Sequence, residues 1–271
     1  MDHIGAARTV TRVSFSRYVA LGDSFTEGVG DPAPDLPNGV RGWADRVAAA
    51  LAAGEPDFGY ANLAIRGRKL GPILTEQIEP AIALNPDLIT LYAGGNDVLR
   101  LSVDIDALMA SYDEAVARLV DTGARVAIFT PHDTAGGGRL FDALRGRFAI
   151  LAEAVREIAD RRGAVIVDFW RLEDYRDWRL WDTDRLHMSP AGHQRMAIAV
   201  LDALGVAHDL APLPLAELPE SSPREQFAEN LRWTREFLGP WLGRRLRGTS
   251  SGDDITPKYP DYIHPAALAT A

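Results

Sequence analysis

The 271-residue chain has no cysteine and only two lysines, Lys69 and Lys258. The absence of cysteine excludes disulfide bonds, thiol catalysis and cysteine-based zinc sites. It is also compatible with a reducing compartment. Residues 1–17 lack the apolar segment of a signal peptide, and we therefore expect a cytoplasmic protein.

Long apolar runs and an excess of positive charge are missing as well. No stretch approaches the roughly 18 consecutive apolar residues that a membrane-spanning helix needs. The formal net charge is −9, whereas nucleic-acid binding requires a basic face that neutralises phosphates. We therefore expect no transmembrane segment and no nucleic-acid partner.

Short apolar runs alternate with longer amphipathic segments over the first three quarters of the chain. The apolar runs predict strands at 18–21, 58–63, 88–93, 125–130 and 164–168. The amphipathic segments predict helices at 42–53, 70–84, 104–122, 139–162 and 189–204. This alternation predicts an α/β fold with a central parallel five-stranded sheet and helices on both faces. Active sites of such sheets lie at the carboxyl ends of the strands.

Residues 206–271 differ in composition from the preceding part. Residues 206–222 are rich in Pro, Leu and Glu and predict an extended connection, followed by one amphipathic helix over about 223–247. Residues 248–271 lack periodicity and predict a tail anchored by Tyr259, Tyr262 and Ile263. We expect a catalytic domain at 1–205 and a C-terminal extension at 206–271. Its helix packs on that domain in one interpretation, and covers the site or pairs with a second copy in the other.

An apolar segment runs directly into Gly22-Asp23-Ser24. This pattern predicts a buried strand that ends in a tight turn, with the Ser24 hydroxyl at the end of the sheet. A serine acts as a nucleophile only with a base, an orienting carboxylate and oxyanion donors nearby. Taken alone, Ser24 is more typical of a turn or helix cap.

The chain has six histidines, and one of them is placed to act as that base. His187 stands directly before a predicted helix, three residues after Asp184. One turn of chain places this carboxylate against the imidazole, where it fixes the tautomer and stabilises the imidazolium. Asp182 is the rival carboxylate. His193 lies within the following helix and is a packing or surface residue.

Two predicted strand ends offer oxyanion donors. Asn96 follows the strand at 88–93, and its amide can donate to a developing negative charge. Gly67 follows the strand at 58–63, where a glycine allows the backbone N–H to approach a substrate. The alternatives are an Asx turn at Asn96 and an ordinary turn glycine at Gly67.

Other chemically suggestive residues have simpler explanations. His132 follows a strand end, and we expect it in a surface loop rather than in the pocket. Aromatic residues of one later segment either wall an acyl or sugar pocket or anchor a long loop; they are Trp170, Tyr175, Trp178 and Trp181. No His-x-x-x-His or cysteine cluster is present, so we expect no metal and no cofactor.

Four of these segments resemble the conserved blocks of a known family. They are Gly22-Asp23-Ser24-Phe25, Asn62-Leu63-Ala64-Ile65-Arg66-Gly67, Gly94-Gly95-Asn96-Asp97 and Asp184-x-x-His187. In this order and spacing they resemble the SGNH hydrolases, also called GDSL esterases or lipases, over roughly residues 16–204. The resemblance implies a three-layer α/β/α sandwich of flavodoxin-like type and hydrolysis of carboxylic esters. Phe25 stands where the family name has leucine, a departure that should affect packing rather than chemistry.

The resemblance also implies a role for each matching residue. Ser24 would be the nucleophile, His187 the base and Asp184 its orienter. The backbone N–H groups of Ser24 and Gly67, with the Asn96 side chain, would form the oxyanion hole.

We therefore expect a serine hydrolase that cleaves a small-molecule ester through an acyl-enzyme intermediate. An acyl transferase or a carbohydrate O-deacetylase would use the same residues and remains an alternative. A non-catalytic binding module is disfavoured because the chain keeps functional groups at positions 24 and 187. A homo-oligomer formed through the C-terminal helix is a further possibility.

Overall fold

The computed structural model describes residues 13–215, 217, 222–239, 243 and 250–268. Within them, six strands form one sheet in the order β5-β4-β3-β1-β2-β6. The strands are β1 (Arg17–Leu21), β2 (Gly59–Asn62), β3 (Leu88–Leu91), β4 (Arg125–Phe129), β5 (Val165–Val167) and β6 (Tyr259–Ile263). The first five strands are parallel, and β6 runs antiparallel to β2. The predicted α/β fold is confirmed, but the predicted count of five strands is wrong by one.

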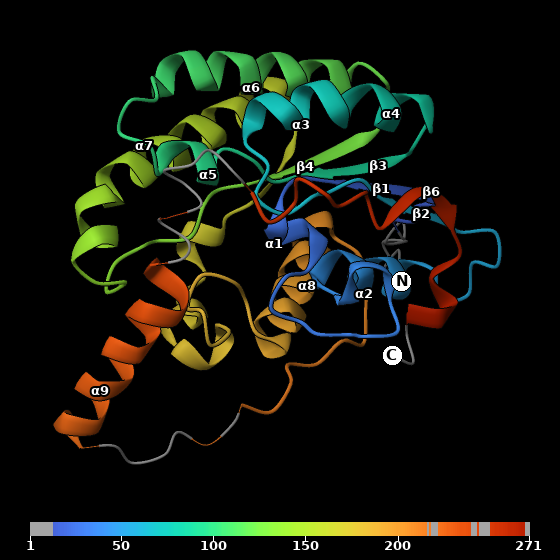
Figure 1. Cartoon of the computed structure of the whole chain (residues 1–271). Coiled ribbons are helices and arrows are strands. Elements are labelled where there is room, and N and C mark those ends of the chain that lie inside the picture. The colour runs from blue at the N-terminus through green and yellow to red at the C-terminus, as the bar shows by residue number, and fades with distance from the viewer. Residues whose placement is uncertain (1–12, 216, 218–221, 240–242, 244–249, 269–271) are drawn as a thin grey trace, which may run out of the picture.

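Helices cover both faces of the sheet (Figure 1). On one face lie α2 (Trp43–Leu51) and α8 (Pro190–Leu204), and on the other α3 (Leu70–Glu76), α4 (Ile78–Ala83), α6 (Ile105–Val120) and α7 (Arg139–Arg162). The two faces bury separate apolar cores, and β1 contributes to both. Tyr18 and Ala20 enter one core while Val19 and Leu21 enter the other. This two-sided burial explains why the strand is a continuous apolar run.

The helix predicted over 70–84 is two helices, α3 and α4, and that prediction is wrong. The break is at Gln77, which is almost fully buried. Its side-chain oxygen accepts from Gly22 N at 2.8 Å, and its side-chain nitrogen donates to Gly22 O at 2.9 Å. The helix is interrupted where this amide binds the end of β1.

Two short helices follow strands directly at the carboxyl edge of the sheet. They are α1 (Ser24–Glu27) after β1 and α5 (Gly95–Val98) after β3. Both lie in segments that the motif analysis singled out, although the periodicity analysis did not predict them as helices. Short 3-10 turns lie at Pro37–Gly39, Phe169–Arg171, Glu173–Arg176, Trp178–Leu180 and Pro265–Leu268.

The described part of the predicted tail, residues 250–268, belongs to the folded body. It contains β6, so the prediction of a tail without regular structure is wrong for this part. The predicted anchors Tyr259, Tyr262 and Ile263 all lie in β6. Pro260 suits this strand because proline is tolerated at the edge of a sheet. A short edge strand with proline carries no clear alternation, which is why the pattern was missed.

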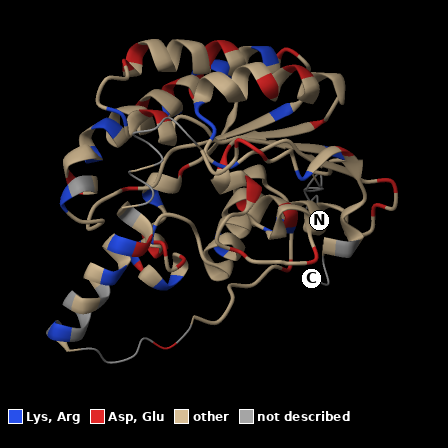
Figure 2. Ribbon diagram, viewed as in Figure 1, with Lys and Arg blue, Asp and Glu red and all other residues tan. Residues whose placement is uncertain are grey.

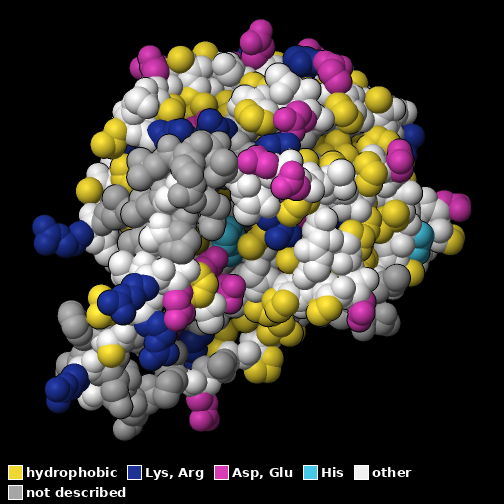
Figure 3. Space-filling view, in the orientation of Figure 1, with side chains coloured by type: hydrophobic (Ala, Val, Ile, Leu, Met, Phe, Trp, Pro, Cys, Tyr) yellow, Lys and Arg dark blue, Asp and Glu magenta, His cyan; other side chains and the backbone are white. Residues whose placement is uncertain are grey.

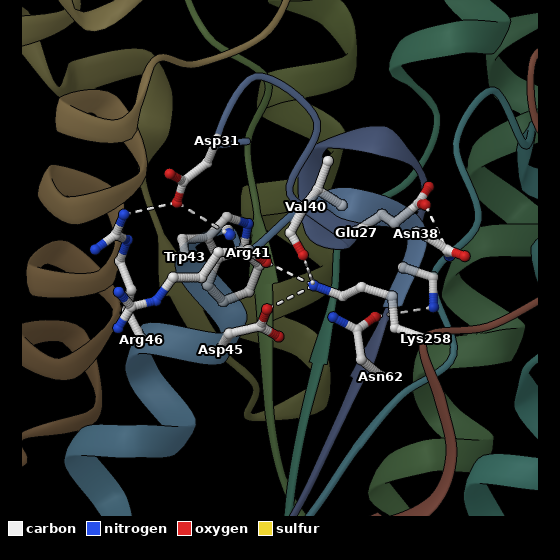
Figure 4. A network of polar contacts seen from close by, with 12 residues as sticks. Glu27, Asp31, Asn38, Val40, Arg41, Trp43, Asp45, Arg46, Asn62 and Lys258 are labelled. Atoms are coloured by element: carbon white, nitrogen blue, oxygen red, sulfur yellow. Dashed lines mark hydrogen bonds and ion pairs between the residues drawn. The ribbon is translucent and has the colours of Figure 1, made fainter. Parts of the chain in front are cut away.

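Lys258 anchors this segment from inside the protein (Figure 4). Its Nζ donates to Asp45 Oδ2 at 2.5 Å, to Arg41 O at 2.6 Å and to Val40 O at 3.3 Å. The side chains of Lys258 and Asp45 are both 0% exposed. One of the two lysines in the chain is therefore part of a buried ion pair that joins β6 to α2.

The helix predicted over 223–247 is described as far as residue 239. It comprises α9 (Pro223–Trp233) and a π-helical turn at Thr234–Leu238, while residues 240–242 and 244–247 lie outside the described residues. In Figure 1, α9 projects from the body of the molecule. The division at residue 205 and the pairing of two copies through this helix stay predictions.

Charged residues of both signs are distributed along the ribbon (Figure 2), and charged side chains of both signs lie on the visible face of the molecule (Figure 3). Several of the residues of α9 that are coloured in Figure 2 are basic. None of the helices in the described residues combines the length and apolar character that crossing a membrane requires.

Candidate active site

The end of β1 holds Ser24 at the carboxyl edge of the sheet. Gly22 has φ +147°, and a Cβ there would lie 2.6 Å from Tyr92 O, so the turn requires glycine. Asp23 then caps α1, because its Oδ1 accepts from Phe25 N at 3.0 Å. Ser24 is the first residue of α1 and is partly exposed.

Ser24, His187 and Asp184 form one hydrogen-bonded chain. His187 Nε2 lies 3.0 Å from Ser24 Oγ, and His187 Nδ1 lies 2.5 Å from Asp184 Oδ2. An ionised carboxylate can only accept, so the proton of a neutral imidazole belongs on Nδ1. The free Nε2 then accepts from the serine hydroxyl, which is the arrangement that general-base activation of a serine requires.

The carboxylate of Asp184 is well satisfied. Its Oδ1 accepts from the backbone N–H groups of Leu186 and His187, both at 2.9 Å. Burial raises the pKa of Asp184, but the hydrogen bond and charge of His187 and the two backbone donors outweigh it and hold the pKa below its usual value. The rival carboxylate Asp182 accepts from Thr183 instead, while its backbone N–H donates to His187 O.

The loop that carries Asp184 contacts the C-terminal extension. Trp233 Nε1 donates to Asp184 O at 2.9 Å. Arg185, which has φ +56°, donates to Asn230 Oδ1 at 2.6 Å and lies over the Trp233 ring. Part of α9 therefore packs directly against the loop that bears the carboxylate and the imidazole.

Asn96 lies beside the serine, and its amide protons are both engaged. Nδ2 donates to Asp23 Oδ2 at 2.9 Å and to Arg68 O at 3.0 Å. Burial raises the pKa of Asp23 to about 7, although Phe25 N–H and the charge of His187 lower it in part. Asn96 faces the same cavity as Ser24, so donation to an oxyanion requires that it exchange one of these two bonds.

Gly67 stands on a loop that other parts of the chain hold in place. It has φ +76°, and a Cβ there would lie 1.9 Å from Ser250 Oγ, so this position requires glycine. Its N–H, like that of Ser24, has no hydrogen-bond acceptor among the residues described. Ser24, Asn96 and His187 line the cavity described below, and Asp184 is bonded to His187, whereas Gly67 neither lines the cavity nor is bonded to one of these four residues.

Glu27 of α1 holds the Gly67 loop. Its fully buried carboxylate accepts from Arg66 N at 2.6 Å and from the Arg66 guanidinium at 2.6 Å. It also accepts from Asn38 Nδ2 at 3.0 Å (Figure 4). The short helix that begins with Ser24 is thereby linked to the loop that follows β2.

A cavity of about 120 Å³ opens beside Ser24 and His187. Its remaining wall is mostly aromatic and apolar and comprises Asp23, Phe25, Tyr92, Gly95, Asn96, Leu99, His132, Phe141, Phe148, Phe169, Trp181, Leu186 and Met188. The expectation that His132 lies in a surface loop is wrong, because its ring packs among aromatic rings of this wall. Trp181 lines the cavity and also packs on Tyr175, so it is both a wall residue of the pocket and a packing residue of its loop.

The remaining histidine of interest has a structural role. His193 is fully buried, accepts from Trp43 N at 3.1 Å and donates to Val29 O at 3.1 Å. Burial lowers its pKa to about 4, so it stays neutral. Among the residues described, no group of three or more His, Asp or Glu side chains is arranged to hold a metal ion.

Sequence reasoning missed several residues of the cavity wall, above all Tyr92. Tyr92 follows β3 directly, and position at the carboxyl end of a parallel strand was the available signal. Phe141 and Phe148 come from α7, whose inward face at this height depends on how the helix crosses the sheet.

A model of the GDSL-like Lipase/Acylhydrolase family matches residues 20–195. A lipase from Streptomyces rimosus is 33% identical over 93 residues, which are 34% of this chain and 34% of that lipase. The chain thus matches about a third of the length of that relative.

Two solved structures are similar over nearly their full length. One is an α/β hydrolase enzyme from the metagenome of Lake Arreo, Spain, with 27% identity, a TM-score of 0.59 and coverage of 71% of this chain and 96% of that chain. The other is a catalytic mutant of an acetylxylan esterase from Geobacillus stearothermophilus, with 24% identity, a TM-score of 0.58 and coverage of 72% and 96%. The likeness to the esterase supports the fold.

Proposed function

This chain belongs to the GDSL-like lipase and acylhydrolase family, and from that premise we propose that it cleaves carboxylic esters through an acyl-enzyme on Ser24. The predicted family is confirmed, and membership in it supports the predicted enzyme class, the carboxylic ester hydrolases. The observation that supports the mechanism is the chain of hydrogen bonds from Ser24 through His187 to Asp184, at the wall of a cavity.

In the first half of the reaction, Ser24 Oγ attacks the ester carbonyl carbon while His187 Nε2 takes the hydroxyl proton. Asp184 stabilises the imidazolium that forms, because its carboxylate is held ionised against Nδ1. The tetrahedral intermediate collapses, the carbon–oxygen bond to the alcohol breaks, and His187 returns the proton to the leaving alcohol.

In the second half, His187 takes a proton from water, and the resulting hydroxide equivalent attacks the acyl carbon. The bond to Ser24 Oγ breaks, the acid leaves, and the proton returns to the serine. Each negatively charged intermediate accepts from the N–H groups of Ser24 and Gly67 and from Asn96, which releases the Arg68 carbonyl to do so.

An acyl transferase or a carbohydrate O-deacetylase is the alternative within the same site. The acyl-enzyme is common to all three, and the acceptor and the alcohol decide the product. Adding alcohol acceptors to an assay with 4-nitrophenyl acetate and measuring how the acyl group partitions between water and alcohol separates hydrolysis from transfer.

The decisive variant is Ser24→Ala. We expect it to lose ester hydrolysis and covalent labelling by a fluorophosphonate while keeping its circular dichroism spectrum and melting temperature. The matched control is Ser111→Ala, which changes an exposed serine of α6 and should retain both activities. Hydrolysis by purified Ser24→Ala at the rate of the parent would refute the proposal.

A further inference from the structure

Two polar side chains of the cavity wall have no hydrogen-bond partner among the residues that the structure describes. They are the hydroxyl of Tyr92 and the imidazole of His132. Tyr92 directly follows β3 and His132 follows β4, and these two strands are neighbours in the sheet. Both side chains line the same cavity as Ser24 and His187.

His132 presents a neutral imidazole in an aromatic enclosure. Its ring centroid lies 4.7 Å from that of Trp181, 5.6 Å from that of Phe169 and 6.3 Å from that of Phe148. Burial lowers its pKa to about 4 despite the neighbouring Asp133, whose carboxylate is bonded to Arg145. At neutral pH the ring therefore has one N–H donor and one nitrogen acceptor.

Tyr92 presents a neutral phenol. Its ring packs against Phe25 with 4.2 Å between centroids, and burial raises its pKa well above the usual value. A Cβ on Gly95 would lie 3.1 Å from its hydroxyl oxygen, which places this hydroxyl beside the turn that carries Asn96. The phenol therefore has one donor and an acceptor oxygen close to the reacting groups.

Neither group is among the fully buried side-chain atoms that lack a partner, so both face the open cavity rather than the packed core. They stand on neighbouring strand ends and line one cavity whose other walls are largely aromatic and aliphatic. Packing alone favours phenylalanine at both positions, because phenylalanine fills similar space without a polar atom. A ligand group in the cavity that both donates and accepts can bind to both of these side chains.

We propose that Tyr92 and His132 form a polar subsite that binds a hydroxyl group of the ester substrate. A hydroxyl both donates and accepts, as a neutral imidazole and a phenol require. The cavity has about 120 Å³, which is less than the roughly 150 Å³ of a closed cavity that holds benzene, so the part of the substrate that lies inside it is compact. The inference rests on the proposed function, since it names the substrate class for the same site.

The first experiment compares two pairs of esters in which a hydroxyl replaces a methyl group. For the acyl side the pair is 4-nitrophenyl 3-hydroxybutyrate and 4-nitrophenyl 3-methylbutyrate. For the alcohol side it is 2-hydroxyethyl butyrate and propyl butyrate. We expect the hydroxylated ester of one pair to have a kcat/KM about 10-fold or more above its partner, because an apolar analogue leaves polar groups of the site unpaired. Equal kcat/KM within both pairs overturns the subsite.

The second experiment assigns the preference to its residues. Tyr92→Phe and His132→Phe each remove a polar atom and keep an aromatic ring, and each should bring the preferred ratio of kcat/KM towards 1. His132→Gln keeps a donor and an acceptor and should restore part of the ratio. Tyr262→Phe is the matched control, because it removes a phenol hydroxyl that bonds to Leu84 O outside the cavity wall, and it should leave the ratio as it is in the parent. Equal loss on both esters of a pair indicates a structural role and overturns the proposal.

These results are distinguishable from failure of the proposed function. Fluorophosphonate labelling of Ser24 reports the competent nucleophile in every variant, independently of the ester. Labelling and hydrolysis without a preference refute only the subsite. Absence of both labelling and hydrolysis in the parent protein refutes the proposed function and the subsite with it.

Discussion

Replacing Lys258 by methionine should destabilise the protein strongly and should do so more at high pH than at low pH. The Lys258 and Asp45 side chains are both 0% exposed, and their charged atoms are 2.5 Å apart. Methionine removes the cation but keeps an unbranched chain of similar length. It leaves the Asp45 carboxylate without its charged partner, and the carbonyls of Val40 and Arg41 without their donor.

Removing one member of a buried ion pair costs about 3–5 kcal/mol of the free energy of unfolding. At about 2–4 °C per kcal/mol for a chain of this size class, the melting temperature should fall by about 10 °C. Burial already raises the pKa of Asp45, and Lys258 counteracts that effect. Without the lysine, the folded-state pKa of Asp45 rises further above its unfolded value. A group with a raised folded-state pKa stabilises the fold at low pH and loses that contribution as pH rises. The loss in free energy of unfolding caused by Lys258→Met should therefore be larger at pH 8 than at pH 5.

The assay is urea unfolding followed by circular dichroism at both pH values. Lys69→Met is the matched control, because Lys69 is half-buried at the start of α3 and forms no ion pair within the described residues. It should change the free energy of unfolding by less than about 1 kcal/mol. The double variant Asp45→Asn with Lys258→Met should recover most of the loss. A cost below about 1 kcal/mol for Lys258→Met, or an equal cost at the two pH values, would refute the reasoning.

Three further predictions concern the site. Asp184→Asn should lower kcat by about 10⁴, because the amide favours the wrong tautomer of His187. Steady-state kinetics tests this prediction, and a loss of kcat below about 10-fold contradicts it. Asn96→Ala should lower turnover by about 10²–10³ if its amide supports the oxyanion, and a near-neutral effect removes it from the site. Asp23 has its folded pKa raised to about 7, so its contribution to stability is lost as pH rises through that value. Urea unfolding gives the free energy of unfolding of the parent and of Asp23→Asn at each pH. The parent value minus the variant value should decrease between about pH 4 and 7, and a difference that does not change with pH would exclude this assignment.

The local sequence was enough to predict the motif blocks and five of the six described strands of the sheet. The five parallel strands are apolar on both faces, so each is a continuous run that can be recognised without its neighbours. Because the carboxyl ends of parallel strands lie at one edge of the sheet, we expect convergence of the residues that follow the first three apolar runs and those that precede the helix at 189–204. Ser24 and His187 do so, within hydrogen-bond distance.

Tertiary contacts decided what the local pattern left open or concealed. Residues far apart in sequence determine that the helix after Lys69 breaks at Gln77, because its amide binds Gly22. The strand β6 exists because Lys258 and the edge of β2 hold a segment with no periodicity of its own.

The same distinction applies to the site. The sequence by itself indicated a candidate nucleophile, a candidate base and a choice between two carboxylates, since these depend on residue type and short spacing. The tertiary structure places Asp184 rather than Asp182 against the His187 imidazole, engages both protons of Asn96, and places His132 in the cavity wall. Hydrogen-bond directions and burial depend on how separate elements pack, and no local pattern encodes them.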